Sequence, residues 1–268
     1  MIPVVCERLT LFPGLPPGNQ PAQRCHERFA GHARGRRGET GTVARPGNKE
    51  ANMPDILEAV HWGPASKGTP KQLVVLCHGL GADAYDLIDL APSWGGAVPD
   101  ALFASVNAPD EHYSGFGRQW WAVGDRRPEV MADGARRAAG FLDAFLDAEL
   151  ARLALPEDAY ALMGFSQGAM TVLFTGLRRV VAPRAILAFS GALIAPEALA
   201  AEQRNKAPVL LVHGEADGQV PVQRSHDAEA VLKAAGVPVE SLYVPQLGHG
   251  IDDSGIAMGA SALRYAFA

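Results

Sequence analysis

Seven short runs of apolar residues recur between residues 56 and 245, and stretches with helical periodicity separate most of them. The expected strands cover 56–61, 72–78, 101–107, 159–165, 184–190, 208–214 and 241–245. Several runs are apolar at every position, as strands buried on both faces of a sheet require. Strands that alternate with helices favour parallel pairing, because a parallel connection needs a long crossover. We therefore expect an α/β fold over residues 53–268, with a mostly parallel central sheet and helices on both faces.

Two of the intervening segments have clear helical signatures. Residues 129–153 place apolar side chains at spacings of three and four, which predicts one long amphipathic helix. Residues 224–235 form a second candidate, for which Ser225 is a plausible N-cap and Gly236 a C-cap.

The first 52 residues differ from the rest in composition. They hold eight Lys or Arg and four Asp or Glu, a net charge of +4, whereas residues 53–268 hold 16 and 25, a net charge of −9. Gly, Pro and Arg are frequent there, and no helical or strand period is visible. We expect residues 1–52 to be a disordered basic extension, or the product of a start codon assigned too far upstream of Met53. A targeting or nucleic-acid-binding arm at "ARGRRG" is the less favoured interpretation.

We expect a chain that starts at Met53 to fold and to retain the activity of the full chain. Residues 1–52 offer too little apolar surface to offset the entropy of ordering them. Melting temperature and turnover of the two chains, measured side by side, test this. A large loss of either on shortening would mean that the extension packs on the domain.

The composition of the whole chain fits a soluble globular protein. Hydrophobic residues make up 48% and charged residues 20%, and no apolar run reaches the length of a membrane span. The N-terminal segment lacks the pattern of a secretory signal, and the three cysteines lack metal-ligand spacing. These features predict a cytoplasmic protein with reduced thiols.

The pentapeptide "GFSQG" places Ser166 between the expected strand 159–165 and a following helical segment. Glycines on both sides allow a tight strand-to-helix turn, where a serine hydroxyl lies exposed at the carboxyl end of its strand. A serine hydroxyl is a poor nucleophile until an imidazole accepts its proton, and the imidazole in turn needs an acid to fix its tautomer. In sheets of this type the acid and then the histidine follow the serine along the chain.

Three histidines follow Ser166. His226 falls within an amphipathic helix and is expected on the surface, and His213 ends an apolar strand, where a structural role is expected. His249 lies between glycines in a loop after the last strand and is the best candidate base.

The acid should come from "EADGQVP", which offers Glu215 and Asp217. The Asp-Gly turn favours Asp217 without excluding Glu215. Asp252 and Asp253 follow His249 too closely and are expected to begin the C-terminal helix.

Acyl transfer also needs two N–H donors for the oxyanion that forms in the transition state. One is expected from the residue after the serine, Gln167. The other should lie in the glycine-containing turn "CHGLGAD" at 77–83, which follows an early strand.

Seven motifs follow one another along residues 56–268: "LCHGLGAD", "DLIDLAP", "NAP" at 107–109, "GRQWW" at 117–121, "GFSQG", "VHGEADGQVP" and "LGHGI". In these motifs and in their order, the chain resembles the phospholipase/carboxylesterase family of α/β hydrolases. The resemblance implies a nucleophile at Ser166, an acid at Asp217 rather than Glu215, a base at His249, and oxyanion donors from the backbones of Leu80 and Gln167.

The expected activity is that of a metal-free, cofactor-free serine carboxylesterase, acting through an acyl-enzyme on small-molecule esters with short to medium acyl chains. A lysophospholipase or acyl-protein thioesterase is the alternative, and a non-catalytic protein that binds a small apolar ligand is the rival from another class. Thioesterase-like members have Trp-Phe-Asp where this chain has Trp120-Trp121-Ala122, which weakens the transfer of their protein substrates.

Trp120 and Trp121 are candidate substrate-binding residues, with core packing as the equal alternative. We expect a monomer or homodimer, no nucleic-acid partner and no stable membrane insertion.

Overall fold

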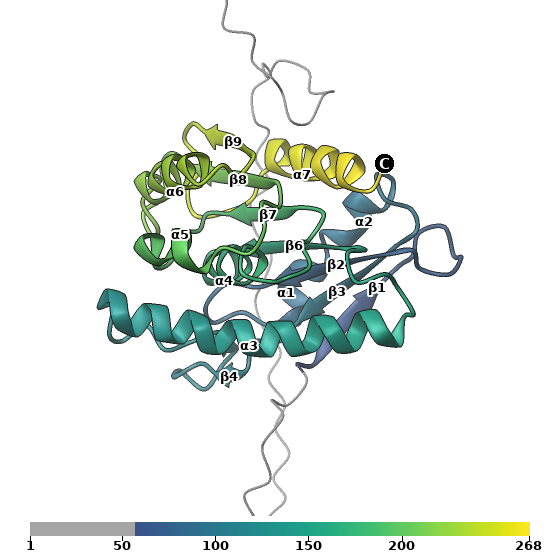
Figure 1. Cartoon of the computed structure of the whole chain (residues 1–268), viewed down its shortest axis with the longest axis horizontal. Coiled ribbons are helices and arrows are strands. Elements are labelled where there is room, and N and C mark those ends of the chain that lie inside the picture. The colour runs from purple at the N-terminus through teal and green to yellow at the C-terminus, as the bar shows by residue number, and fades with distance from the viewer. Residues whose placement is uncertain (1–56) are drawn as a thin grey trace, which may run out of the picture. The chain divides into compact units, whose positions relative to one another are not determined.

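The computed structural model describes residues 57–268, and the expected extension at 1–52 lies outside this part of the chain. A seven-stranded sheet has the order β1-β3-β2-β6-β7-β8-β9. The strands are β1 (Ala59–Trp62), β2 (Gln72–Cys77), β3 (Ala101–Val106), β6 (Tyr160–Phe165), β7 (Ile186–Phe189), β8 (Val209–Gly214) and β9 (Val239–Val244). Only β1 is antiparallel to its neighbour in this sheet, so the expected mostly parallel sheet is confirmed (Figure 1).

Each face of the sheet carries its own hydrophobic core. Side chains alternate along each strand, so that Leu73 and Val75 of β2 point to one face and Val74 and Leu76 to the other. Both sets are fully buried, which explains the unbroken apolar runs in the sequence.

Helices cover both faces of the sheet. The first face packs against α3 (Pro128–Arg152), α4 (Gln167–Gly176) and α6 (Gln223–Ala234). The second packs against α1 (Ala84–Ile88), α2 (Ala91–Gly95) and α7 (Asp253–Ala266). In Figure 1 the long helix α3 runs along the opposite side of the sheet from α7.

The remaining elements are short and lie in connections. A two-stranded hairpin pairs β4 (Asp110–Glu111) with β5 (Arg118–Gln119), and a 3-10 turn (Pro196–Ala198) leads into α5 (Leu199–Glu202). Within residues 57–268, every helix is too short or too polar to span a bilayer.

The helix expected at 129–153 is confirmed as α3, and Asp252 accepts the N–H of Gly255 as the N-cap of α7, as expected. The N-cap expected for α6, Ser225, is wrong. Its N-cap is Val222, and Ser225 lies inside the first turn, where its hydroxyl is bound to Nδ1 of His213 at 2.7 Å. Gly236 follows the helix end with φ of +73°, the left-handed conformation in which helices often end.

Candidate active site

Ser166 occupies a strained turn between β6 and α4. Its φ of 54° and ψ of −115° are unusual for a residue with a side chain. The N–H of Ser166 donates to the carbonyl of Phe189 on β7 at 2.9 Å, which fixes the turn against the neighbouring strand. A side chain at Gly164 would overlap the carbonyl of Gly168, and one at Gly168 would overlap the carbonyl of Cys77. The two glycines therefore allow α4 to pack tightly on β2 and β6.

Asp217 and His249 come from the loops after β8 and β9 and meet through a short hydrogen bond. Nδ1 of His249 lies 2.6 Å from Oδ2 of Asp217. The other carboxylate oxygen accepts the N–H groups of Gln219 and Val220 at 2.8 and 2.9 Å. A carboxylate can only accept, so Nδ1 of His249 carries a proton, and in the neutral imidazole Nε2 is the nitrogen with a free lone pair.

The electrostatic environment keeps Asp217 ionised. Burial alone would raise the pKa of its carboxyl, but the hydrogen bonds from His249, Val220 and Gln219 outweigh it and hold the pKa below its ordinary value. Glu215 is exposed at the start of the same loop. Of the two acids considered, the structure brings Asp217 to His249.

The two other downstream histidines lie where the sequence placed them. His226 is exposed on α6, with its ring 4.0 Å from that of Tyr243. His213 is fully buried: Nδ1 contacts Ser225, and Nε2 donates to the carbonyl of Val220 at 2.8 Å. Its Nε2 also lies 3.2 Å from Oδ2 of Asp217, so His213 supports the acid rather than facing the serine.

Ser166 and His249 line one cavity of about 1130 Å³ at the carboxyl ends of β2, β6, β7 and β8. Ligands bind at this edge of open α/β sheets. Its apolar walls include Val123, Met131, Met170, Leu193 and Ile194. The charged side chains that line it are two acids, Asp86 and Glu197, and two arginines, Arg126 and Arg224, so their formal charges cancel.

Leu80 and Gln167, the expected oxyanion donors, also line this cavity. Gln167 is the first residue of α4, where a backbone N–H has no carbonyl of its own helix to bind. The N–H of Leu80 has no acceptor among the hydrogen bonds of residues 57–268, whereas the neighbouring N–H of Gly81 donates to the backbone carbonyl of Arg118. The loop that carries Leu80 lies against the serine, because a Cβ atom placed on Gly79 would be 3.3 Å from the Cβ atom of Ser166.

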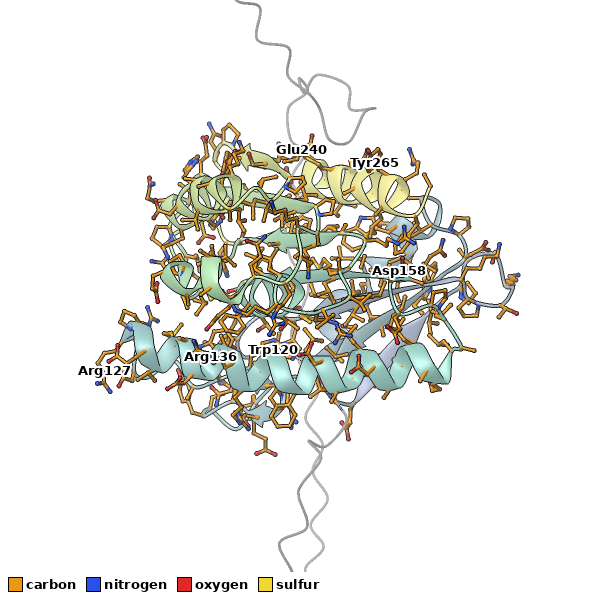
Figure 2. All side chains as sticks on the ribbon, in the orientation of Figure 1. Trp120, Arg127, Arg136, Asp158, Glu240 and Tyr265 are labelled. Atoms are coloured by element: carbon orange, nitrogen blue, oxygen red, sulfur yellow. The ribbon has the colours of Figure 1, made fainter. Side chains whose placement is uncertain are left out.

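Trp120 and Trp121 do not line the cavity. Trp120 is completely buried and lies near α3 in Figure 2. Trp121 is 3% exposed, and both side chains belong to the core on the α3 side of the sheet. Of their two interpretations, core packing is the one that the structure supports. Two further aromatic side chains, Tyr113 and Phe116, lie between β4 and β5; they are more than four-fifths exposed and do not line the cavity.

Sequence reasoning missed the side chains that do form the walls, Val123, Arg126, Met131, Met170 and Arg224 among them. No sequence motif distinguishes these side chains from other surface residues.

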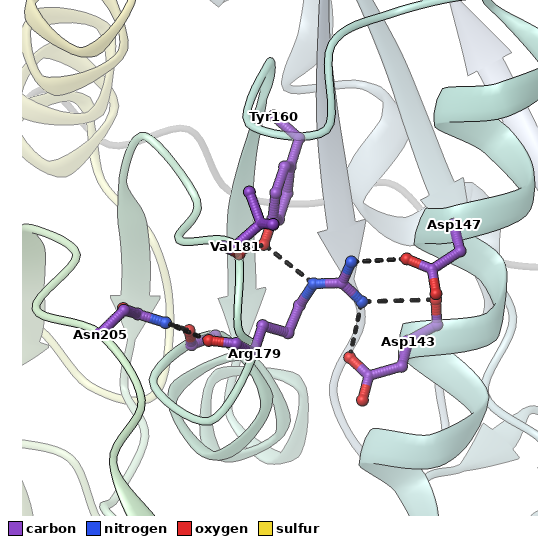
Figure 3. A network of polar contacts seen from close by, with 7 residues as sticks. Asp143, Asp147, Tyr160, Arg179, Val181 and Asn205 are labelled. Atoms are coloured by element: carbon purple, nitrogen blue, oxygen red, sulfur yellow. Dashed lines mark hydrogen bonds and ion pairs between the residues drawn. The ribbon is translucent and has the colours of Figure 1, made fainter.

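A second hollow of about 640 Å³ lies beside Arg179, Asp143 and Asp147. Arg179 bonds Asp143 at 2.8 Å, Asp147 at 2.6 Å and the hydroxyl of Tyr160 at 3.0 Å (Figure 3). Tyr160 begins β6, whereas Ser166 follows its end, so this network fastens α3 at the other end of the strand. Its groups are bound to each other, which indicates a structural role. Within residues 57–268, no group of three or more His, Cys, Asp or Glu side chains could hold a metal ion.

Comparison with known proteins places the chain among esterases. The profile of the family described as Phospholipase/Carboxylesterase matches residues 64–266. Esterase YpfH of Escherichia coli (strain K12) is 27% identical over 203 residues, covering 73% of this chain and 83% of the relative.

A rice relative (Oryza sativa subsp. japonica), the probable inactive carboxylesterase Os04g0669700, is also 27% identical, over 70% of this chain and 82% of the relative. The crystal structure of esterase PE8 superposes with a TM-score of 0.74 at 40% identity, covering 78% of this chain and 98% of that structure. The chain belongs to the phospholipase/carboxylesterase family of α/β hydrolases.

Proposed function

We propose that the protein is a serine carboxylesterase in which Ser166, His249 and Asp217 form the catalytic triad. The observation that carries this proposal is the shared cavity: a serine in a strained turn and a histidine held by a buried carboxylate line the same space. Each feature alone is common, whereas together they provide an activated nucleophile with room for a substrate.

The reaction begins when Oγ of Ser166 attacks the ester carbonyl carbon and Nε2 of His249 accepts the hydroxyl proton. The carbonyl oxygen becomes an oxyanion, which the N–H groups of Leu80 and Gln167 bind. Each such donor contributes about 2.7–4 kcal/mol to the stability of the transition state in enzymes of this kind. When the intermediate collapses, the alcohol leaves with the proton from His249, and the acyl group stays on Ser166.

Hydrolysis of the acyl-enzyme repeats these steps with water as the nucleophile. His249 accepts a proton from the water, and the second oxyanion collapses to release the carboxylic acid and Ser166. Asp217 remains ionised throughout, and its attraction stabilises the imidazolium form of His249.

The cavity supports neutral esters as substrates. Its apolar walls suit an acyl chain, and its two acids and two arginines give no net preference for a charged group.

We expect kcat/KM to be greatest for short- to medium-chain esters. A series of p-nitrophenyl esters from acetate to palmitate, assayed beside a lysophospholipid and a palmitoylated peptide, measures this preference, with Ser166→Ala as the blank. A greater kcat/KM on the lysophospholipid or the palmitoyl thioester would favour the lysophospholipase or thioesterase alternative.

The rival function is suggested by the rice relative, which is described as a probable inactive carboxylesterase. A non-catalytic member of this family would keep the cavity and could bind a small apolar ligand without turnover. Covalent reaction at Ser166 separates this rival from the esterase.

A further inference from the structure

The proposed triad leaves several motifs of the chain unexplained: "HGLG", "NAP", "GRQWW" and the glutamine of "GFSQG". In the structure their residues meet in one buried network around the loop that carries Leu80. Its three members, His78, Trp120 and Gln167, have exposed fractions of 0, 0 and 3%. We call these residues the His78–Trp120–Gln167 network.

His78 joins the network from the end of β2. Its Nε2 accepts the N–H of Ala108 at 3.1 Å, and its Nδ1 donates to the carbonyl of Gly79 at 2.7 Å. A backbone N–H can only donate, so Nε2 is unprotonated and the proton lies on Nδ1. Burial lowers the pKa of His78 and thereby maintains the neutral form that this pattern needs.

Trp120 links His78 to the turn of the nucleophile. Its indole Nε1 donates to the carbonyl of His78 at 3.0 Å. Its backbone N–H donates to Oε1 of Gln167 at 2.9 Å, and Nε2 of Gln167 donates to the carbonyl of Trp121 at 2.8 Å. Both ends of the Gln167 amide are therefore used, and its orientation is fixed.

The hairpin that precedes Trp120 holds the same loop from a second side. The N–H of Gly81 donates to the backbone carbonyl of Arg118 at 2.8 Å, and the N–H of Arg118 donates to the carbonyl of Ala82 at 2.7 Å. Gly117 has φ of +70°, and a side chain there would overlap the carbonyl of Gly81. The loop is thus bonded on both sides of Leu80.

We propose that the His78–Trp120–Gln167 network is a positioning device that sets the spacing between the two oxyanion donors. One donor, the N–H of Leu80, is two residues from His78, and the other, the N–H of Gln167, belongs to the residue whose side chain holds Trp120. Within the network, Trp120 is the member that is hydrogen-bonded to both segments. The inference depends on the proposed function, since it assigns a role to residues around the proposed oxyanion hole.

Positioning matters because the donors must match the oxyanion rather than the ground-state carbonyl. A displacement of about 1 Å can cost about a hundredfold in rate. A loosened network should therefore lower kcat and leave KM nearly unchanged, because the apolar walls that bind the acyl chain are not part of it.

The test is Trp120→Phe, with Trp94→Phe as its matched control. Trp94 is also completely buried, and its Nε1 also donates to a backbone carbonyl, that of Ile256 at 2.9 Å, but it lies on the opposite face of the sheet. We expect similar falls in melting temperature for the two variants. We expect kcat to fall about tenfold to a hundredfold in Trp120→Phe, with KM unchanged, and to stay near the wild-type value in Trp94→Phe.

Inhibitors give a readout that a purely structural role would not change. Ser166 adds through Oγ to the carbonyl carbon of 1,1,1-trifluoro-2-heptanone, its proton passes to His249, and the ketone oxygen becomes an oxyanion. 2-Heptanone serves as the analogue that binds without forming the adduct. In Trp120→Phe, affinity for the trifluoromethyl ketone should fall by the same factor as kcat/KM, while affinity for 2-heptanone stays unchanged.

Gln167→Met provides an independent variant, because it keeps the backbone N–H and removes both side-chain hydrogen bonds. We expect the same pattern of kcat, KM and inhibitor affinity. Unchanged kcat in both Trp120→Phe and Gln167→Met overturns the proposal, as does an equal loss in Trp94→Phe or a change confined to KM. If the wild-type protein and Ser166→Ala bind the trifluoromethyl ketone equally, the proposed function fails instead.

Discussion

Replacing Ser166 with alanine is expected to lower kcat on a p-nitrophenyl ester by about 10⁶, the loss that follows when one member of a triad acting as a unit is removed. Alanine keeps the backbone turn and deletes only the hydroxyl, so the acyl-enzyme cannot form. The glycines on both sides and the bond from Ser166 N–H to Phe189 do not depend on that hydroxyl. The melting temperature should therefore stay at the wild-type value while turnover is lost.

Two histidine variants complete this test. His249→Ala should be nearly as damaging, because the hydroxyl loses its base. His226→Ala is the control, since His226 is exposed on α6 and does not line the cavity. Retention of most activity by folded Ser166→Ala, or an equal loss in His226→Ala, would refute the assignment.

Asp217→Asn is expected to lower kcat by about 10⁴, the loss known for the same change in another triad enzyme. Oδ1 of Asp217 accepts two backbone N–H groups, so the amide oxygen of asparagine should take that position. The amide NH₂ would then donate to Nδ1 of His249, and the imidazole proton would move to Nε2. In that tautomer Nε2 cannot accept the proton of Ser166.

Steady-state kinetics of Asp217→Asn beside Glu215→Gln measure this effect. Glu215 is exposed two residues away, and its variant should retain wild-type turnover. Equal losses in the two variants, or near wild-type activity of Asp217→Asn, would show that the carboxylate at 217 does not set the tautomer of His249.

The central strands of the sheet could be predicted from the sequence because they are buried on both faces. The expected segments 72–78 and 159–165 differ from β2 and β6 by one residue at one end. Unbroken apolar runs leave little ambiguity when amphipathic helices separate them. Edge elements gave a weaker signal: β1 begins three residues later than expected, and the hairpin of β4 and β5 was missed.

The candidate site was predictable where chemistry requires particular residues in a fixed order. Ser166 and His249 line the same cavity, and Asp217 is hydrogen-bonded to His249, as that order suggested. Contacts that depend on tertiary packing were not predictable. Ser225 is a residue type that commonly caps helices, but its hydroxyl is hydrogen-bonded to His213 on β8 instead.

Trp120 shows the same limit for substrate recognition. An aromatic residue in a long connection suits a binding wall and a core equally well, and only the bonds to His78 and Gln167 decide for the core. The walls of the cavity come from separate connections, and their side chains converge only after the sheet has formed.

The central claim is that Ser166 is an activated nucleophile, and covalent labelling tests it most directly. A fluorophosphonate probe is incubated with the full chain, and the site and stoichiometry of the adduct are determined by mass spectrometry of peptides. We expect one equivalent on Ser166, and loss of labelling in His249→Ala. An unlabelled protein, or an adduct on another residue, would contradict this account.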